Sequence, residues 1–435
     1  MMTEAEALEA LAREDPAVAS DARAALRWLT SGGGLETISQ LRLQEFLWHV
    51  LPSTWPLSSS GQLAVARALG RLLTLAGLDR YADACSSAET ERIIGAYAES
   101  LGDGVAAYLA ALDASQAAPP DTNLLAWSSD SAKGPEEQAA YEHCATAIEL
   151  AITAGELKVG ISGWKTKRAA LVDRWLTSSD AGTDSLLSRI SAERIEDWAH
   201  GHPGERSRMA RRVVPRLLEP PVLPGEPLPT LRWLLQHADA GLRLTARHYI
   251  APAVVEEAAG IFGWGEPASK RRQELAVYPL HILRCLAQHE MGAVRRRGTS
   301  LVLTKAGRLM AGDPTVRWHI GTAALIGTDD GPDPDFAVAV REAAFLVIVL
   351  SGSPVGREEL TERLIRLHAA EGWTSRSGGD LARAIRYETS MLIQRLTALQ
   401  LLDANGTVGD VTLTATGIAA ARSALLARAL RPRRP

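Results

Sequence analysis

The chain has 435 residues, a hydrophobic content of 46% and a formal net charge of −4. This length exceeds one ordinary core and predicts about two to four domains. No apolar run approaches the roughly 20 residues of a membrane span, and the acidic start of the chain has neither the basic nor the apolar region of a secretion signal. Three scattered cysteines predict reduced thiols, so we expect a cytoplasmic protein without a membrane segment.

The charge is distributed unevenly along the chain. Residues 1–130 hold 8 Arg/Lys and 17 Asp/Glu, a net charge of −9. Residues 269–312 hold 9 and 2, a net charge of +7, and residues 376–435 hold 9 and 4, a net charge of +5. This asymmetry favours binding of an anion by the C-terminal half. A solvated arginine-rich surface explains the same numbers, and both interpretations stay open.

The N-terminal half reads as helical. Residues 1–118 predict an acidic helical bundle, because apolar residues recur at spacings of three and four and breaks come at helix lengths. Residues 119–135 predict a linker, since they are rich in Pro, Ser and Asp. Residues 136–218 predict a second helical domain, and residues 219–229, with five prolines, a semi-rigid linker. We therefore expect little or no sheet before residue 220.

One segment of the C-terminal half occurs twice. Leu286 to Gly307 and Leu396 to Gly417 share the end of an apolar-striped helix, a polar turn, a β-branched run and Leu-Thr-x-x-Gly, at an offset of 110 residues. Helix, turn, strand and Thr-capped helix is the order of the second half of a winged helix. The sequence thus predicts winged-helix-like domains at 230–325 and 336–430, in a chain that is mainly α-helical with small β-wings.

Basic and polar residues surround the helix predicted at 277–288, which would face a ligand. The candidate DNA contacts are Lys270, Arg271, Arg272, His281, Arg284, Gln288, Arg295, Arg296 and Arg297. The first three precede the helix and the last three lie at the predicted tip of the wing, two places that flank a DNA groove. His281, Arg284 and Gln288 share one helix face, where Arg reads guanine and Gln adenine. The alternative is that the domain docks a protein and its arginines are plain surface.

The second predicted wing, residues 405–410, contains no arginine. The helix before it carries three secondary candidates for DNA contact, Arg383, Arg386 and Arg395. A wing without cations favours a supporting, dimerising or protein-docking role for the second domain.

No pattern of residues indicates catalysis. The chain lacks a nucleophile elbow, a phosphate-binding loop, a dinucleotide fingerprint and a zinc-protease motif. His200 and His202 have no Cys or carboxylate cluster at zinc spacing near them. We expect no catalytic residue, no metal and no cofactor, and keep an enzyme with scattered site residues as a weaker alternative.

Two pieces of the chain, together about half of it, resemble a known group of proteins. The matching residues are Gly241 to Thr245, Tyr249, Leu280 to Leu286, Val294 to Gly298, Leu301 to Thr304, Gly307, Asp313 and Pro314, with Leu43 to Leu51 and Leu69 to Leu78 in the N-terminal part. They resemble uncharacterised proteins of high-GC (actinobacterial) genomes that are labelled plasmid open-reading-frame-like. The resemblance implies a helix and wing frame and no catalytic residues.

These patterns together predict a DNA-binding, regulatory protein that uses winged-helix units on double-stranded DNA. The alternative is a non-catalytic scaffold whose winged helices dock proteins. A protein partner is expected at the acidic N-terminal domain or at the second winged-helix unit.

Overall fold

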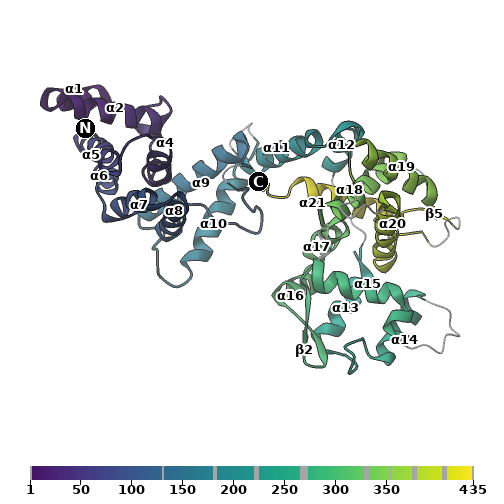
Figure 1. The fold of residues 1–435 in the computed structure, drawn as a ribbon. Coiled ribbons are helices and arrows are strands. Elements are labelled where there is room, and N and C mark those ends of the chain that lie inside the picture. Colours follow the sequence, from purple (N-terminus) through teal and green to yellow (C-terminus); the bar gives the residue numbers. More distant parts are fainter. Residues whose placement is uncertain are drawn as a thin grey trace. The chain divides into compact units, whose positions relative to one another are not determined.

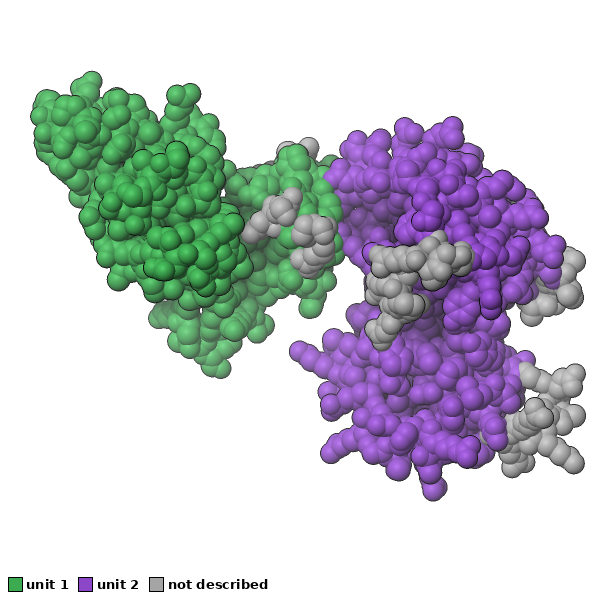
Figure 2. All heavy atoms as spheres, viewed as in Figure 1, with its two compact units in different colours: residues 1–193, 432–435 green, residues 194–431 purple. Residues whose placement is uncertain are grey.

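The computed structural model divides the chain into two compact units (Figures 1 and 2). Unit 1 comprises residues 1–193 and 432–435, and unit 2 comprises residues 194–431. The structure describes residues 2–129, 132–179, 184–219, 225–264, 273–327, 334–352, 354–374, 380–403 and 409–433. The described part is mainly α-helical, with small antiparallel sheets in the C-terminal half, which confirms the coarse fold class.

Unit 1 is built of helices, and its described residues contain no strand, as the apolar spacing predicted. The helices are α1 (Glu4–Glu14), α2 (Pro16–Thr30), α3 (Gln40–Glu45), α4 (Leu51–Thr54), α5 (Ser59–Leu75), α6 (Asp79–Cys85), α7 (Ala88–Glu99), α8 (Leu101–Ser115), α9 (Pro135–Thr153), α10 (Trp164–Thr177) and the first part of α11 (Leu186–Gly201). A π-helical stretch, η2 (Phe46–Val50), joins α3 to α4, and a 3-10 turn, η1 (Leu35–Thr37), precedes α3.

Serine side chains set where several of these helices begin. Ser58, Ser87 and Ser100 precede α5, α7 and α8, and each accepts the backbone N–H three residues further on. Such a cap satisfies one of the N–H groups that a helix start leaves without a partner, which stabilises it by about 1 kcal/mol.

The segment at 119–135 contributes to the core of unit 1. Leu125 and Trp127 are 6% and 5% exposed and pack with residues from both sides of it. The Trp127 indole donates to Pro120 O at 3.1 Å, and its backbone N–H donates to Asp121 at 2.9 Å. The structure thus places residues 1–118 and 136–193 in one unit, where the composition suggested two domains joined by a linker.

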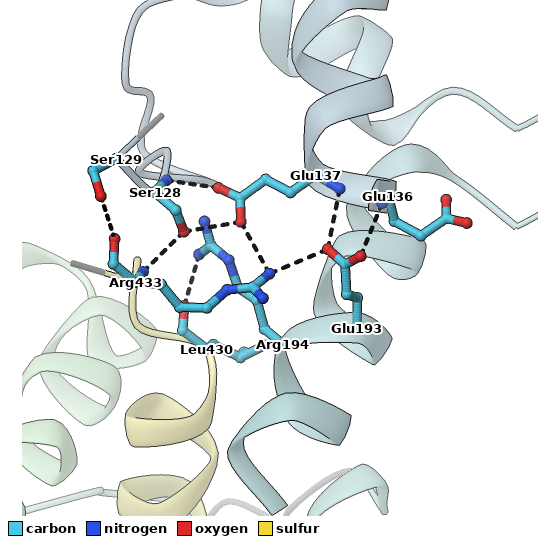
Figure 3. A network of polar contacts seen from close by, with 8 residues as sticks. All are labelled: Ser128, Ser129, Glu136, Glu137, Glu193, Arg194, Leu430 and Arg433. Atoms are coloured by element: carbon cyan, nitrogen blue, oxygen red, sulfur yellow. Dashed lines mark hydrogen bonds and ion pairs between the residues drawn. The ribbon is translucent and has the colours of Figure 1, made fainter. Parts of the chain in front are cut away.

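A buried carboxylate network surrounds the start of α9 (Figure 3). The Glu193 carboxylate accepts the N–H groups of Glu136 and Glu137 at 2.8 and 3.1 Å, in place of a side-chain cap. A Cβ on Gly134 would lie 2.4 Å from the Glu193 carboxyl carbon, so a larger residue there would displace this carboxylate. Glu137, which is fully buried, accepts from Ser128 N at 2.6 Å and from Ser128 Oγ at 2.9 Å.

The segment around Arg433 completes this network and so belongs to unit 1. The Arg433 guanidinium lies 3.2 Å from Glu193 and 3.5 Å from Glu137. Its backbone N–H donates to Ser128 Oγ at 2.8 Å, and its carbonyl accepts from Ser129 N at 3.1 Å. The chain therefore enters unit 1 a second time after it leaves unit 2.

Unit 2 combines helices with short strands. Its helices after α11 are α12 (Gly204–Leu218), α13 (Pro229–Asp239), α14 (Pro252–Phe262), α15 (Tyr278–Cys285), α16 (Lys305–Gly312), α17 (Pro314–Ile326), α18 (Pro334–Ser351), α19 (Arg357–Ala370), α20 (Leu381–Ala398) and α21 (Ala415–Ala429). Its strands are β1 (Leu242–Arg243), β2 (Val294–Arg297), β3 (Ser300–Leu303), β4 (Val355–Gly356) and β5 (Asp410–Val411). A 3-10 turn, η4 (Glu274–Ala276), precedes α15, and a π-helical stretch, η5 (Leu286–Glu290), follows it.

The same order of elements occurs twice in unit 2. The first repeat runs α13, β1, α14, α15, β2, β3 and α16, and the second runs α18, β4, α19, α20, β5 and α21. In place of β2, the second repeat has an isolated bridge from Leu402 to Leu413. The hairpin predicted near Arg296 is present, while the predicted Asn405-Gly406 turn lies outside the described residues. Both repeats share one core.

The repeated Leu-Thr-x-x-Gly has the same physical role in both copies. Thr304 caps α16 by accepting from Gly307 N at 3.1 Å, and Thr414 caps α21 by accepting from Gly417 N at 2.9 Å. A Cβ on Gly307 would lie 2.0 Å from Ala293 O, and one on Gly417 would lie 2.1 Å from Leu401 O. Each helix therefore begins against a backbone carbonyl, which only glycine allows.

The difference in residue number between structurally equivalent positions is not the same throughout the two repeats. The Thr and Gly pairs are 110 residues apart, but the equivalent carbonyls, Ala293 and Leu401, are 108 apart. The second copy has two residues fewer between Leu396 and Leu401 than the first has between Leu286 and Ala293. It has two more between Leu401 and Thr414 than the first has between Ala293 and Thr304. A strict offset of 110 therefore pairs the wrong residues in this stretch.

Candidate nucleic-acid interface

The three strands of the first repeat form an antiparallel sheet in the order β1, β3, β2. Its cross-strand rows are Leu242, Leu301 and Arg296 in one case, and Arg243, Ser300 and Arg297 in the next. Residues in one row point to the same face, and adjacent rows point to opposite faces. Leu242 and Leu301 are buried in the core, so the row with two arginines points away from it.

Arg295 points to the same face of the sheet as this outer row. It pairs with Val302 two residues along β2 from Arg297, and therefore points to the same outer face. Ser300 lies between Arg243 and Arg297, and opposite residues in antiparallel strands have their Cβ atoms about 5 Å apart. We call Arg243, Arg295 and Arg297 the arginine face. All three side chains are exposed.

Two more exposed arginines border the arginine face. Arg296 belongs to the inner row, but it lies on β2, an edge strand of the sheet, and is exposed. Arg247 lies in the exposed turn after β1. The tip of the hairpin, Gly298 and Thr299, is fixed beside this turn, because Leu244 N donates to Thr299 O at 2.8 Å. Gly298 has φ +60° at the first central position, as a type II′ turn requires.

These five arginines form no ion pair or side-chain hydrogen bond with another residue that the structure describes. Five less exposed arginines of unit 2 are different, because they pair with carboxylates. The pairs are Arg206 with Glu371 (2.6 Å), Arg284 with Glu274 (2.7 Å), Arg317 with Glu226 (2.9 Å), Arg341 with Glu388 (2.9 Å) and Arg395 with Glu290 (2.8 Å). The arginine face thus has no neutralising carboxylate among the residues that the structure describes.

The helix expected to read bases, α15, holds its polar residues in an internal network. Glu274, which is fully buried, accepts from Ile250 N at 2.6 Å through Oε2. Its Oε1 lies 2.8 Å from His281 Nδ1 and 2.7 Å from Arg284 Nε. Gln288 Oε1 lies 3.5 Å from Arg284 Nη1. His281, Arg284 and Gln288 do share one face, as predicted, but that face is turned to a buried carboxylate.

Helix α15 also packs against α20, the equivalent helix of the second repeat. Tyr278 Oη lies 4.0 Å from Met391 Sδ across this contact. Arg395 of α20 is 5% exposed, pairs with Glu290 and donates to Ala324 O at 2.8 Å. Arg395 is therefore a buried structural cation and does not belong to a binding surface. Helices α15 and α20 each cover part of the other's surface. Neither helix therefore exposes its whole length to a DNA groove.

Other candidates lie elsewhere. Arg383 and Arg386 are exposed on α20. Lys270, Arg271 and Arg272 lie outside the described residues, as does most of the second wing. Arg243 and Arg247 were not among the residues predicted from the sequence, although the alternation Leu242, Arg243, Leu244 is the signal of a strand with one polar face.

The second repeat lacks the arginine face. The positions equivalent to Arg243 and Ser300 are Gly356 and Asp410, which pair in the same antiparallel register. The described part of this sheet thus carries an acid and no arginine where the first carries arginines. The two repeats share a frame but not a surface charge.

Metal and membrane sites receive no support from the described residues. No group of three or more His, Cys, Asp or Glu side chains is arranged there to hold a metal ion. His202 Nε2 instead lies 3.2 Å from the buried Glu342, and His200 Nδ1 lies 2.9 Å from Glu196 O. No helix in this part of the chain is both long and apolar enough to cross a bilayer.

The placement of Arg284 predicts a structural effect when it is replaced. Arg284→Ala removes one of two cations from a buried carboxylate and should lower the free energy of unfolding by roughly 2 kcal/mol, the size of a hydrogen bond to a charged group. Arg386→Ala, in an exposed residue of α20, is the control and should change it by less than about 0.5 kcal/mol. Urea denaturation measures both. If Arg284→Ala leaves the stability unchanged and abolishes a preference for one DNA sequence, the result would support a role of Arg284 in reading DNA bases.

Comparison of the chain with protein-family models, with curated proteins and with solved structures gives no match.

Proposed function

We propose that this chain binds double-stranded DNA by its phosphate backbone, through the arginine face of the first repeat, and that it is not an enzyme. The observation that carries the proposal is the set of exposed arginines on β1 and β2 that have no partner among the described residues, beside an interior where five arginines are paired with carboxylates. Arginine binds phosphate oxygens bidentately, and phosphate contacts supply most of the affinity of non-specific DNA binding.

In this proposal each repeat is a winged helix. The order helix, strand, two helices, hairpin and helix in the first repeat supports it, as does the same order in the second. A wing that contacts phosphates is one of the two DNA contacts of this fold. The other DNA contact of the fold is made by the helix before the wing. Here that helix, α15, bonds to Glu274 through Arg284 and packs against α20. Binding should therefore depend little on DNA sequence, since sequence is read through base edges.

The test compares two triple variants with equal changes of charge. The first, Arg243→Ala, Arg295→Ala and Arg297→Ala, removes the arginine face. The second, Arg208→Ala, Arg211→Ala and Arg212→Ala, removes three exposed arginines from α12 of the same unit. Fluorescence anisotropy with labelled duplexes of two unrelated sequences measures affinity against salt.

We expect the first variant to bind both duplexes more weakly and to lose about 2.7 from the slope of log K against log salt, about 0.9 for each phosphate contact. The control should lose much less. Equal losses in both variants would reduce the effect to net charge and contradict a specific role of the arginine face.

Protein docking is the second candidate function, and it concerns the second repeat. In that repeat, Gly356 and Asp410 stand at the positions equivalent to Arg243 and Ser300. The N-terminal part of the chain is acidic. A protein scaffold would leave the chain without affinity for DNA at low salt. The same anisotropy experiment distinguishes the two functions.

A further inference from the structure

A cysteine, a histidine and a glutamate lie in a row in the first repeat. Cys285 and His281 are one turn apart on α15, and Cys285 Sγ lies 3.7 Å from His281 Nε2. The other ring nitrogen, Nδ1, lies 2.8 Å from Glu274 Oε1. A nucleophile beside a base that a third group orients is the arrangement that activates cysteines. Cys285 is partly exposed, while Cys85 and Cys144 are buried.

The row places a charged neighbourhood beside the Cys285 thiol. The Glu274 carboxylate, fully buried, faces two cationic side chains, His281 and Arg284, both on its Oε1. One carboxylate neutralises one cation, so a positive charge is left beside the thiol. A neighbouring imidazolium or guanidinium stabilises the thiolate, which is the nucleophilic form.

The pKa of His281 is shifted upward in this arrangement. The hydrogen bond with Cys285, then the one with Glu274, raises the pKa of His281 to about 9, so the ring is protonated at neutral pH. Burial raises the pKa of Cys85 and of Cys144 to about 12. The chain thus contains one thiol in a cationic setting and two inert ones.

We propose that Cys285 is a reactive thiol that hydroperoxides oxidise to a sulfenic acid, with His281 as the group that positions it and holds the proton. The sulfur attacks the terminal oxygen of the hydroperoxide, the S–O bond forms and the O–O bond breaks. Cys285 loses two electrons to the peroxide, which is reduced. The alkoxide or hydroxide that leaves takes the proton from His281 Nε2, so the products are the sulfenic acid and an alcohol or water.

The first experiment uses the unmodified full-length chain with its own unfolded state as control. Iodoacetamide labels the chain at pH 6.5, native and in urea, and mass spectrometry gives the alkylation rate of each cysteine. An ordinary thiol is only about 1% ionised at this pH. We expect Cys285 to react at least tenfold faster in the native chain than in urea, and Cys85 and Cys144 to react more slowly. A native rate for Cys285 at or below its rate in urea would overturn the proposal.

The second experiment tests the peroxide and His281. After exposure to hydrogen peroxide, dimedone should mark a sulfenic acid at Cys285 and at neither buried cysteine. His281→Asn keeps a hydrogen-bond donor for Glu274 but no ring charge, and should slow both alkylation and dimedone labelling of Cys285 about tenfold. No dimedone adduct at Cys285, or equal rates in a folded His281→Asn chain, would contradict the assignment. Because neither readout involves DNA, failure here leaves the proposed DNA binding untouched.

Discussion

Gly307→Ala is expected to destabilise unit 2 by on the order of 3 kcal/mol. The new Cβ would lie 2.0 Å from Ala293 O, a carbonyl that already accepts from Thr304 N at 3.0 Å. The helix start or the strand must therefore move, and the cap of α16 moves with it. Gly417→Ala should have a similar effect through Leu401 O, at 2.1 Å.

Gly312→Ala is the matched control for this prediction. Gly312 ends the same helix, and a Cβ there would have no atom within 4 Å. Replacing a helical glycine by alanine without a clash is neutral or stabilises by up to about 1 kcal/mol. Urea denaturation of the three variants gives the comparison. Equal stability of Gly307→Ala and Gly312→Ala would show that the contact with Ala293 O is not a constraint.

Glu137→Ala is expected to destabilise unit 1 by roughly 3 kcal/mol, the lower end of the cost of removing one partner of a buried ion pair. The substitution leaves the Ser128 N–H and one side of the Arg433 guanidinium without their acceptor. Because Arg433 anchors the segment after unit 2, we also expect this segment to exchange its amide hydrogens faster.

Glu136→Ala, one residue earlier, controls for the loss of a charge at the start of α9. Glu136 pairs with Arg189 at 2.8 Å, and the two side chains are 46% and 40% exposed, so this pair should contribute less than about 1 kcal/mol. Hydrogen exchange of peptides from 135–153 reports the stability of α9 in both variants. Equal exchange in the two would mean that the network of Figure 3 adds nothing to the stability of unit 1.

The local features of the fold were predictable from the sequence, because neighbouring residues create them. The run from Val294 to Leu303 has the pattern of strand, Arg-Gly turn and strand, and it forms a hairpin with exposed arginines. The repeated Thr-x-x-Gly predicted capped helices at Thr304 and Thr414, and both are present.

The partners of the candidate site residues were not predictable, because they lie outside the helix whose periodicity was used for the prediction. Arg284 has the polar spacing of a base-reading residue, but Glu274, from the turn before the helix, pairs with it. Arg395 pairs with Glu290, which lies 105 residues away. Periodicity along one helix predicts on which face of the helix a side chain lies. It does not predict which other parts of the chain pack against that face. For the same reason the sequence did not bring Cys285, His281 and Glu274 together.

The most direct test of the proposed function is the binding of the unmodified chain to two duplexes of unrelated sequence, measured by anisotropy at about 50 mM and about 200 mM salt. DNA binding through phosphates predicts micromolar affinity at the lower salt, similar values for both duplexes and a steep loss at the higher salt. No binding by micromolar protein at the lower salt would contradict it and favour protein docking.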